Sequence, residues 1–111
     1  MEYKFELLSG AKESLSGWPK KHRDKINHFL YLLAEKNGIL DEPYSKHIRG
    51  KIRELRIDFG KVRYRLLYAL LPEMVIVILA AFRKNTEKTP ENVIRKAEAL
   101  LKLYQNFYEK K

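Results

Sequence analysis

The sequence predicts an α+β protein, in which helices and an antiparallel sheet come from separate parts of the chain. Two observations carry this prediction. Three segments with strand periodicity follow one another closely between residues 51 and 83, and segments with helical periodicity lie on either side of them. The length of 111 residues fits one domain, 1–111, with a single hydrophobic core.

The chain begins with a predicted strand at about residues 2–8. Apolar Tyr3, Phe5 and Leu7 alternate there with charged residues, and alternation with a period of two is typical of a half-buried strand. A short helix is expected at about residues 11–16, between two Ser-Gly pairs.

A longer helix is predicted to begin at Trp18-Pro19 and to end near Asn37-Gly38. Proline is preorganised for the first helical position, and glycine adopts the left-handed conformation that ends many helices. The apolar residues of this helix recur at intervals of three and four and predict one buried stripe, made of Ile26, Phe29, Leu30 and Leu33. Residues 38–50 show no sustained period and are expected to form a loop.

Three strands are predicted at residues 51–58, 62–71 and 74–83. Gly60 marks the first turn and Pro72-Glu73 the second, so the strands should form an antiparallel meander. The apolar stretch 66–82 is long enough to span a bilayer, but the Pro-Glu pair in its middle favours a buried hairpin over a membrane helix.

The last helix is predicted to start with Thr89 as its N-cap and Pro90 at its first position. Its apolar stripe consists of Ile94, Ala97, Leu101, Tyr104 and Tyr108. We interpret this stripe as a face buried against the sheet. The aromatic end of the helix leaves a self-association surface as the alternative.

The composition indicates a polyanionic partner. The chain has 23 Lys and Arg residues against 14 Asp and Glu residues, a net charge of +9, and such a field attracts nucleic acids and acidic proteins. There is no cysteine, which removes disulfides and thiolate chemistry and fits a reducing cytoplasm. The N-terminal residues lack the apolar region of a signal peptide, so we expect a cytoplasmic protein that does not bind membranes.

The positive charge is concentrated between Lys46 and Arg65, where eight basic residues stand against two acidic ones. Strand alternation places Tyr64 on the core face of its strand and Arg63 and Arg65 on the opposite, open face. Arg56 should join them from the preceding strand. A guanidinium group can donate two parallel hydrogen bonds to the oxygens of one phosphate, so this face suits a nucleic-acid backbone. The alternative is a sheet edge kept soluble by charge, with its arginines paired to Glu54 and Asp58.

The sequence argues against metal and covalent chemistry. His22, His28 and His47 lack the spacing of metal ligands, and there is no cysteine, Gly-rich phosphate loop or nucleophile elbow. We therefore expect neither a metal nor a cofactor. RNA permits a reaction without either, because its own 2′-hydroxyl can attack the adjacent phosphate while the protein stabilises the charge that develops.

Several segments together resemble the phage-derived Gp49-like branch of HigB toxins, in the RelE/HigB superfamily. They are the run from Lys51 to Gly60, the run from Val62 to Tyr68, the strand end at residues 81–84 and the segment Thr86 to Pro90. The resemblance implies a RelE-like fold, a twisted antiparallel sheet packed by an N-terminal helical hairpin and a C-terminal helix. It also implies a type II toxin–antitoxin toxin, a ribosome-dependent endoribonuclease that cleaves mRNA in the A site and is neutralised by a cognate antitoxin.

The resemblance also assigns residues. Arg65 matches the arginine that contacts the scissile phosphate, Arg56 matches a further basic contact, and Arg83 or Lys84 falls where the last strand contributes another cation. We assign the remaining basic residues near this site to RNA binding, namely Arg53, Arg63, Lys51, Lys61 and His47. The tyrosine or histidine that several RelE-type toxins carry after the last strand is replaced here by Asn85, Thr86 and Thr89. Either Lys84 or Arg83 then aids the leaving group, or His47 reaches the site, or the protein is a slow nuclease.

Two other functions remain open at this stage. A ParE-like gyrase inhibitor would share the fold and lack a hydrolytic site. A non-catalytic basic RNA-binding domain would be expected to show aromatic side chains on the sheet for base stacking, whereas Tyr64 and Tyr68 belong to the core set.

Overall fold

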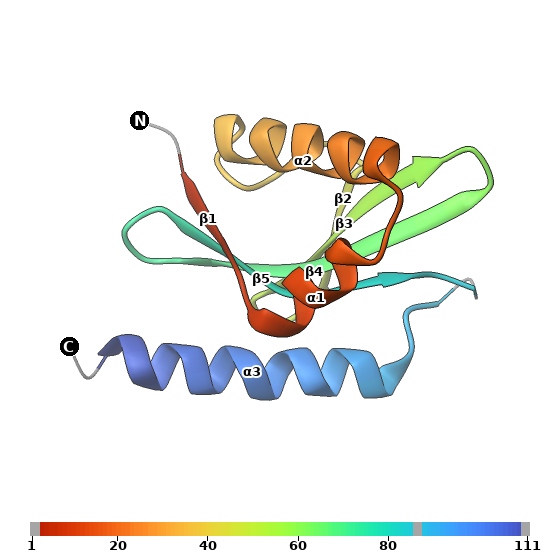
Figure 1. The fold of residues 1–111 in the computed structure, drawn as a ribbon. Coiled ribbons are helices and arrows are strands. Elements are labelled where there is room, and N and C mark those ends of the chain that lie inside the picture. Colours follow the sequence, from red (N-terminus) through yellow and green to blue (C-terminus); the bar gives the residue numbers. More distant parts are fainter. Residues whose placement is uncertain (1–2, 86–87, 110–111) are drawn as a thin grey trace.

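The computed structural model describes residues 3–85 and 88–109 and confirms the α+β fold class. A five-stranded sheet in the order β1-β5-β4-β3-β2 lies between helices on both of its faces (Figure 1). The strands are β1 Lys4–Leu7, β2 Ser45–Arg49, β3 Ile52–Phe59, β4 Val62–Leu71 and β5 Val75–Arg83. The helices are α1 Ser9–Ser16, α2 Lys20–Glu35 and α3 Glu91–Glu109.

The strands β3, β4 and β5 form the predicted antiparallel meander, and β2 extends it by one unpredicted strand. β1 runs parallel to β5, so the sheet is mixed. Lys4 is paired with Val75 and Leu7 with Ile78. The chain leaves β1, passes through α1 and α2, and returns to the sheet at the far edge, in β2 (Figure 1). Alternation along β1 predicted a strand but carried no information about the direction of its neighbour.

The predicted loop 38–50 is wrong in its second half, because residues 45–49 form strand β2 at the edge of the sheet. β2 pairs with β3 from Ser45 opposite Leu55 to Arg49 opposite Ile52. Its sequence contains a single large apolar residue, Ile48, and therefore gives no alternation to recognise. The strand forms because its backbone completes the hydrogen bonds of β3.

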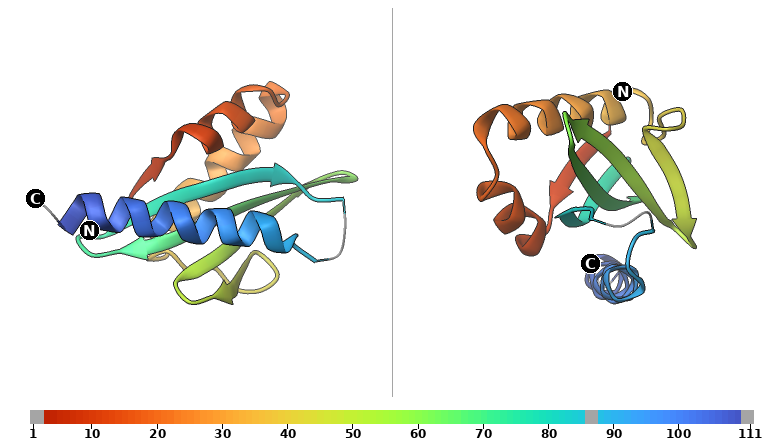
Figure 2. Two further views of the ribbon diagram at one scale, coloured as in Figure 1. Left: turned by 90° about the horizontal axis from the view of Figure 1, so that it is seen from below. Right: turned by 90° about the vertical axis from the view of Figure 1, so that its right-hand side faces the viewer.

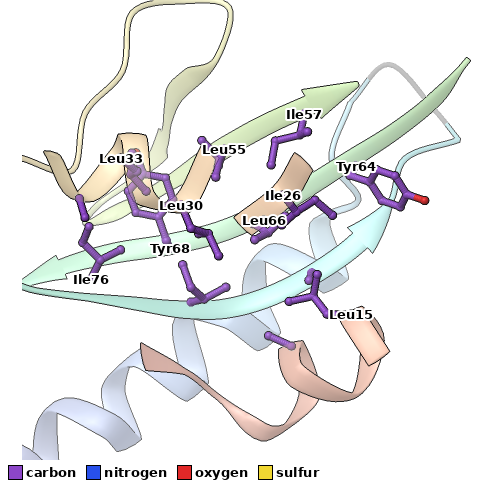
Figure 3. Close-up of a cluster of buried hydrophobic side chains, with 14 residues drawn as sticks. Leu15, Ile26, Leu30, Leu33, Leu55, Ile57, Tyr64, Leu66, Tyr68 and Ile76 are labelled. Atoms are coloured by element: carbon purple, nitrogen blue, oxygen red, sulfur yellow. The ribbon is translucent and has the colours of Figure 1, made fainter. Parts of the chain in front are cut away.

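One face of the sheet is covered by α1 and α2. Buried side chains of both helices meet the sheet in a single cluster, and Figure 3 shows Ile26 and Leu30 of α2 facing Leu66 and Tyr68 of β4. The predicted stripe of α2 is confirmed, with Phe29 partly buried beside it. The helix ends as expected, with Gly38 at a φ of +86° and its amide donating to the carbonyl of Leu33.

The other face, predicted to be open, is covered along much of its length by α3 (Figure 2). A second apolar cluster lies there, so the expectation of a single core is wrong. Ile94, Ala97 and Leu101 are its buried helical members, which confirms the stripe of α3, while the side chain of Tyr108 lies outside the described residues. The sheet contributes Ile52, Leu67, Ala69, Leu71, Val75, Val77 and Leu79.

The apolar stretch 66–82 forms most of the β4–β5 hairpin, as predicted. Within residues 3–85 and 88–109, no helix is long and apolar enough to cross a membrane.

Candidate functional site

Two hollows meet at Arg56 of β3. The first has a volume of about 360 Å³ and is lined by Lys25, Phe29, Pro43, Tyr44, Arg56, Asp58 and Arg65. The second, of about 380 Å³, lies between β2, β3 and the segment that leads from β5 into α3, and its polar lining includes Lys46, His47, Glu54, Arg56, Lys84 and Thr89. Arg56 is thus the cation that lines both hollows.

Glu54 organises the cations around the second hollow. Its side chain is 0% exposed, and its Oε1 accepts a hydrogen bond of 3.0 Å from Nε of Arg56. The hydroxyl of Thr89 donates to Oε2 of the same carboxylate. A buried carboxylate needs compensating partners of this kind. Glu54 was missed as a site residue, although its place two residues before Arg56 puts both on one strand face.

Thr89 has a different role from the one predicted. We expected it to cap the last helix, whereas α3 begins at Glu91 and the Thr89 hydroxyl donates to Glu54 on β3. This contact joins strands and helix at the site. The sequence could not show it, because it spans 35 positions.

Arg65 lies on the predicted face of β4 but is buried rather than open, with 7% of its surface exposed. Its Nη1 donates to Oδ1 of Asp58 at 2.9 Å and to the carbonyl of Tyr64 at 2.8 Å. Its Nε lies 3.9 Å from Oε1 of Glu54 and has no hydrogen-bond partner among the described residues. The alternative weighed from sequence, arginines paired to Glu54 and Asp58, is therefore present within the site itself.

Arg56 and Lys84 complete the cationic part of the site. The side chain of Arg56 is 28% exposed, which leaves it open to a ligand while Glu54 holds its Nε. Lys84 is buried, and its backbone amide donates to the carbonyl of Arg63 at the start of β4. Burial lowers the pKa of the Lys84 amine from its ordinary value, and the positive charges of Arg65, Arg56 and Lys46 lower it further against the opposing effect of Glu54.

Several predicted residues do not join this group. Arg53 lies on the opposite face of β3, where its guanidinium donates to Ser45 and to Tyr68. Lys51 and Lys61 occupy the turns at opposite ends of β3. That strand of eight residues is about 25 Å long, so the two cations cannot contact one phosphate.

The remaining predicted residues divide between the two faces. Arg63 is exposed on β4, on the strand face of Arg65. The Arg83 guanidinium lies over the ring of Tyr64, 5.5 Å from its centroid, so of the pair Arg83 and Lys84 only Lys84 lines the hollow. His47 does line it, with Nε2 placed 2.8 Å from the carbonyl oxygen of Gly50.

Among the described residues, no group of three or more His, Asp or Glu side chains is placed to hold a metal ion. The donors available at the site are guanidinium, amine, imidazole and hydroxyl groups. These suit an anion.

Comparison with known structures identifies the fold. The E. coli toxin RelE, solved as an arginine double mutant in the free state, matches with a TM-score of 0.66 and 20% identity, covering 89% of this chain and 97% of that one. The toxin–antitoxin complex RelBE2 of Mycobacterium tuberculosis matches with a TM-score of 0.60 and 20% identity, covering 76% and 100%. The RelE–RelB complex of Pyrococcus horikoshii matches with a TM-score of 0.59 and 21% identity, covering 77% and 98%.

Sequence comparison defines the family. Curated proteins give no match to this chain. The family described as "Phage derived protein Gp49-like" matches residues 13–102, a span that includes α2, the strands β2 to β5, both hollows and most of α3. The chain therefore belongs to the phage-derived Gp49-like family and has the fold of the RelE toxins.

Proposed function

We propose that this protein is the toxin of a type II toxin–antitoxin system, an endoribonuclease that cleaves mRNA in the ribosomal A site, in the cytoplasm. Family membership and the RelE fold support the toxin class. The observation that carries the nuclease activity is the convergence of Arg56, Arg65 and Lys84 around the buried Glu54. Three cations held in fixed positions are suited to a phosphate whose charge increases during the reaction.

The cleavage step uses the RNA as its own nucleophile. The 2′-oxygen attacks the adjacent phosphorus, the bond from phosphorus to the 5′-oxygen breaks, and the products are a 2′,3′-cyclic phosphate and a free 5′-hydroxyl. Arg56 and Arg65 stabilise the phosphorane between these two steps, because guanidinium groups stay charged at every relevant pH. No metal or cofactor is needed for this chemistry.

Proton transfers are assigned to Lys84 and His47. The Gly50 carbonyl can only accept a hydrogen bond, so Nε2 of His47 carries a proton, and the nitrogen that can act as a base is Nδ1. That nitrogen takes the proton of the 2′-hydroxyl. The Lys84 ammonium, whose pKa is lowered towards the working range of an acid catalyst, gives its proton to the leaving 5′-oxygen.

The partners follow from this activity. The ribosome presents the mRNA, and a cognate antitoxin holds the toxin inactive. The solved complexes from Mycobacterium tuberculosis and Pyrococcus horikoshii pair a RelE-type protein with an antitoxin, which supports such a partner here. With a net charge of +9, the chain suits an acidic antitoxin segment through charge complementarity.

The test is primer extension on an mRNA translated in vitro with the wild type, Arg65→Ala and Arg56→Ala. We expect A-site cuts with the wild type and a loss of about 10²-fold or more in each variant, the size of effect seen when one charge-stabilising donor is removed. Lys12→Ala, which changes an exposed lysine of α1, is the matched control and should cut like the wild type.

Each outcome decides one assignment. Because Arg65 is buried, its variant is first compared with the wild type by circular dichroism, and Arg65→Lys serves in its place if the alanine variant does not fold. Equal cutting by a folded Arg65 variant and the wild type removes Arg65 from the mechanism. If the wild type does not cut in the presence of translating ribosomes, the nuclease proposal itself is wrong.

A further inference from the structure

We propose that the first hollow is a nucleobase pocket that selects guanine in the RNA strand bound at the site. The inference rests on the proposed function, because it places the base beside the phosphate held by Arg56. It assigns a role to Tyr44 and Asp58, which the cleavage mechanism leaves unused.

The pocket exists because β2 is shorter than β3. Pairing with β2 ends at Leu55, and the backbone amide of Arg56 instead donates to the carbonyl of Tyr44 at 2.8 Å. The chain before β2 therefore stands against the edge of β3, with Phe29 of α2 on its other side. The enclosed volume of about 360 Å³ falls within the range of about 300 to 1,000 Å³ found for small-molecule sites.

Tyr44 supplies a surface for stacking. Tyr44 is 48% exposed, whereas Tyr64 and Tyr68 are buried. Its ring centroid lies 5.6 Å from that of Phe29, with the planes tilted by 37°. Phe29 is itself packed against the hydrophobic core and so fixes the position of the tyrosine. Bases of single-stranded RNA stack on aromatic rings held in this way.

Asp58 supplies the selectivity. Its side chain is 60% exposed and borders the hollow, while Oδ1 accepts the hydrogen bond from Arg65. Guanine presents two adjacent donors, N1–H and the 2-amino group, to such a carboxylate. Adenine and cytosine present a donor beside an acceptor, and uracil presents one donor between two carbonyls, so each of these places an oxygen or nitrogen lone pair against the charge.

Lys25 completes the recognition of guanine. It also borders the hollow, and its ammonium already donates to the backbone carbonyl of Asp58. An ammonium has three donors, so a further one is available for the O6 acceptor of guanine. The first hollow also has two aromatic rings in its lining, Phe29 and Tyr44, whereas no phenylalanine, tyrosine or tryptophan of the described residues lines the second hollow.

The first test is direct binding to the isolated protein, without ribosomes. The four ribonucleoside 3′-monophosphates are titrated into the wild type, with tyrosine ring signals followed by NMR. We expect guanosine 3′-monophosphate to bind about tenfold more tightly than the others. Tyr44→Ala should weaken it about tenfold, Tyr44→Phe should retain it, and Asp58→Asn should remove the preference for guanine. Tyr31→Ala is the control. It changes an exposed tyrosine that lies on α2, outside the first hollow, and should bind like the wild type.

The result that overturns the proposal is equal affinity for all four nucleotides, or unchanged affinity in Tyr44→Ala. The ribosome assay gives an independent reading. If the wild type cuts mRNA and Tyr44→Ala cuts with the same base preference, the pocket is wrong and the nuclease stands. If the wild type binds the guanine nucleotide as expected and does not cut, the pocket stands and the proposed function is wrong.

Discussion

At the scale of single residues, the site depends on a carboxylate that sequence reasoning treated only as a neutralising charge. Glu54 is fully buried, accepts hydrogen bonds from Arg56 and Thr89, and lies near the unpaired Nε of Arg65. Removing one partner of a buried ionic group leaves the others uncompensated, so such groups fix geometry more than they add stability. Glu54 is in this sense the positioning residue of the proposed phosphate site.

Lys84 makes the stability of the protein depend on pH. The pKa of its amine is lowered in the folded state and returns to about 10.5 in the unfolded chain. Between the lowered pKa and that value, the unfolded state binds more protons, so rising pH stabilises the fold. Below the lowered pKa, the amine is protonated in both the folded and the unfolded state, so the folded state bears the full free-energy cost of burying the ammonium.

The measurement is urea unfolding of the wild type and Lys84→Met from about pH 7 to about pH 10. We expect the wild type to gain stability relative to the variant as the pH rises through this window. The comparison cancels the titration of the exposed lysines, which both proteins share. A difference in unfolding free energy that stays constant across the window contradicts the burial of a charged amine at this position.

At the scale of elements, two glycines with positive φ change the direction of the chain, Gly38 after α2 and Gly60 between β3 and β4. Gly38 ends α2 at a φ of +86°, and its carbonyl accepts the hydroxyl of the buried Tyr68 at 2.8 Å. A Cβ atom at this position would lie 2.2 Å from Cδ2 of Leu70. Gly60, in the β3–β4 turn, has a φ of +62° and open space around it.

The two glycines therefore form a matched pair. Gly60→Ala should cost about 1 kcal/mol, the strain of a left-handed residue with a side chain. Gly38→Ala should cost about 1 to 3 kcal/mol more, because Leu70 must also move. Chemical denaturation of both variants measures the difference. Equal destabilisation would show that Leu70 moves aside without loss of packing, and that only the backbone conformation matters.

At the scale of the whole molecule, α3 packs on the sheet and buries the second apolar cluster (Figure 2). The sheet is therefore covered by helices on both faces. Arg49 at the end of β2 binds Glu91 and Glu98 on α3, each at 2.8 Å. These groups are exposed, so the contact orients the helix more than it stabilises it. The helix also contributes Glu91 and Ile94 to the lining of the second hollow.

Removing α3 should disrupt the fold. A chain that ends at residue 90 exposes the sheet members of the second cluster, and we expect it to bind a hydrophobic dye and lose cooperative thermal unfolding. Arg49→Ala is the control, since loss of the two exposed ion pairs should cost less than about 1 kcal/mol each. A truncated chain that stays monomeric and unfolds cooperatively would show that α1 and α2 suffice to hold the sheet.

The sequence by itself determined those strands and helices whose apolar residues recur with a regular period. The periods of two and 3.6 are local properties, so β4, the stripe of α2 and the inward direction of Tyr64, Leu66 and Tyr68 could be read directly. The charge between Lys46 and Arg65 and the family motifs indicated the region of the proposed phosphate site.

Tertiary structure decided the rest. The pairing of β1 with β5 and the existence of β2 depend on backbone hydrogen bonds with distant segments, which leave no pattern in the side chains. The contacts of the buried Arg65 are with Asp58 and Glu54 of β3, and the separation of Arg83 from Lys84 depends on which face each meets at the end of β5. Contacts between residues far apart in the chain determine these features, because burial and ion pairing are properties of neighbours in space.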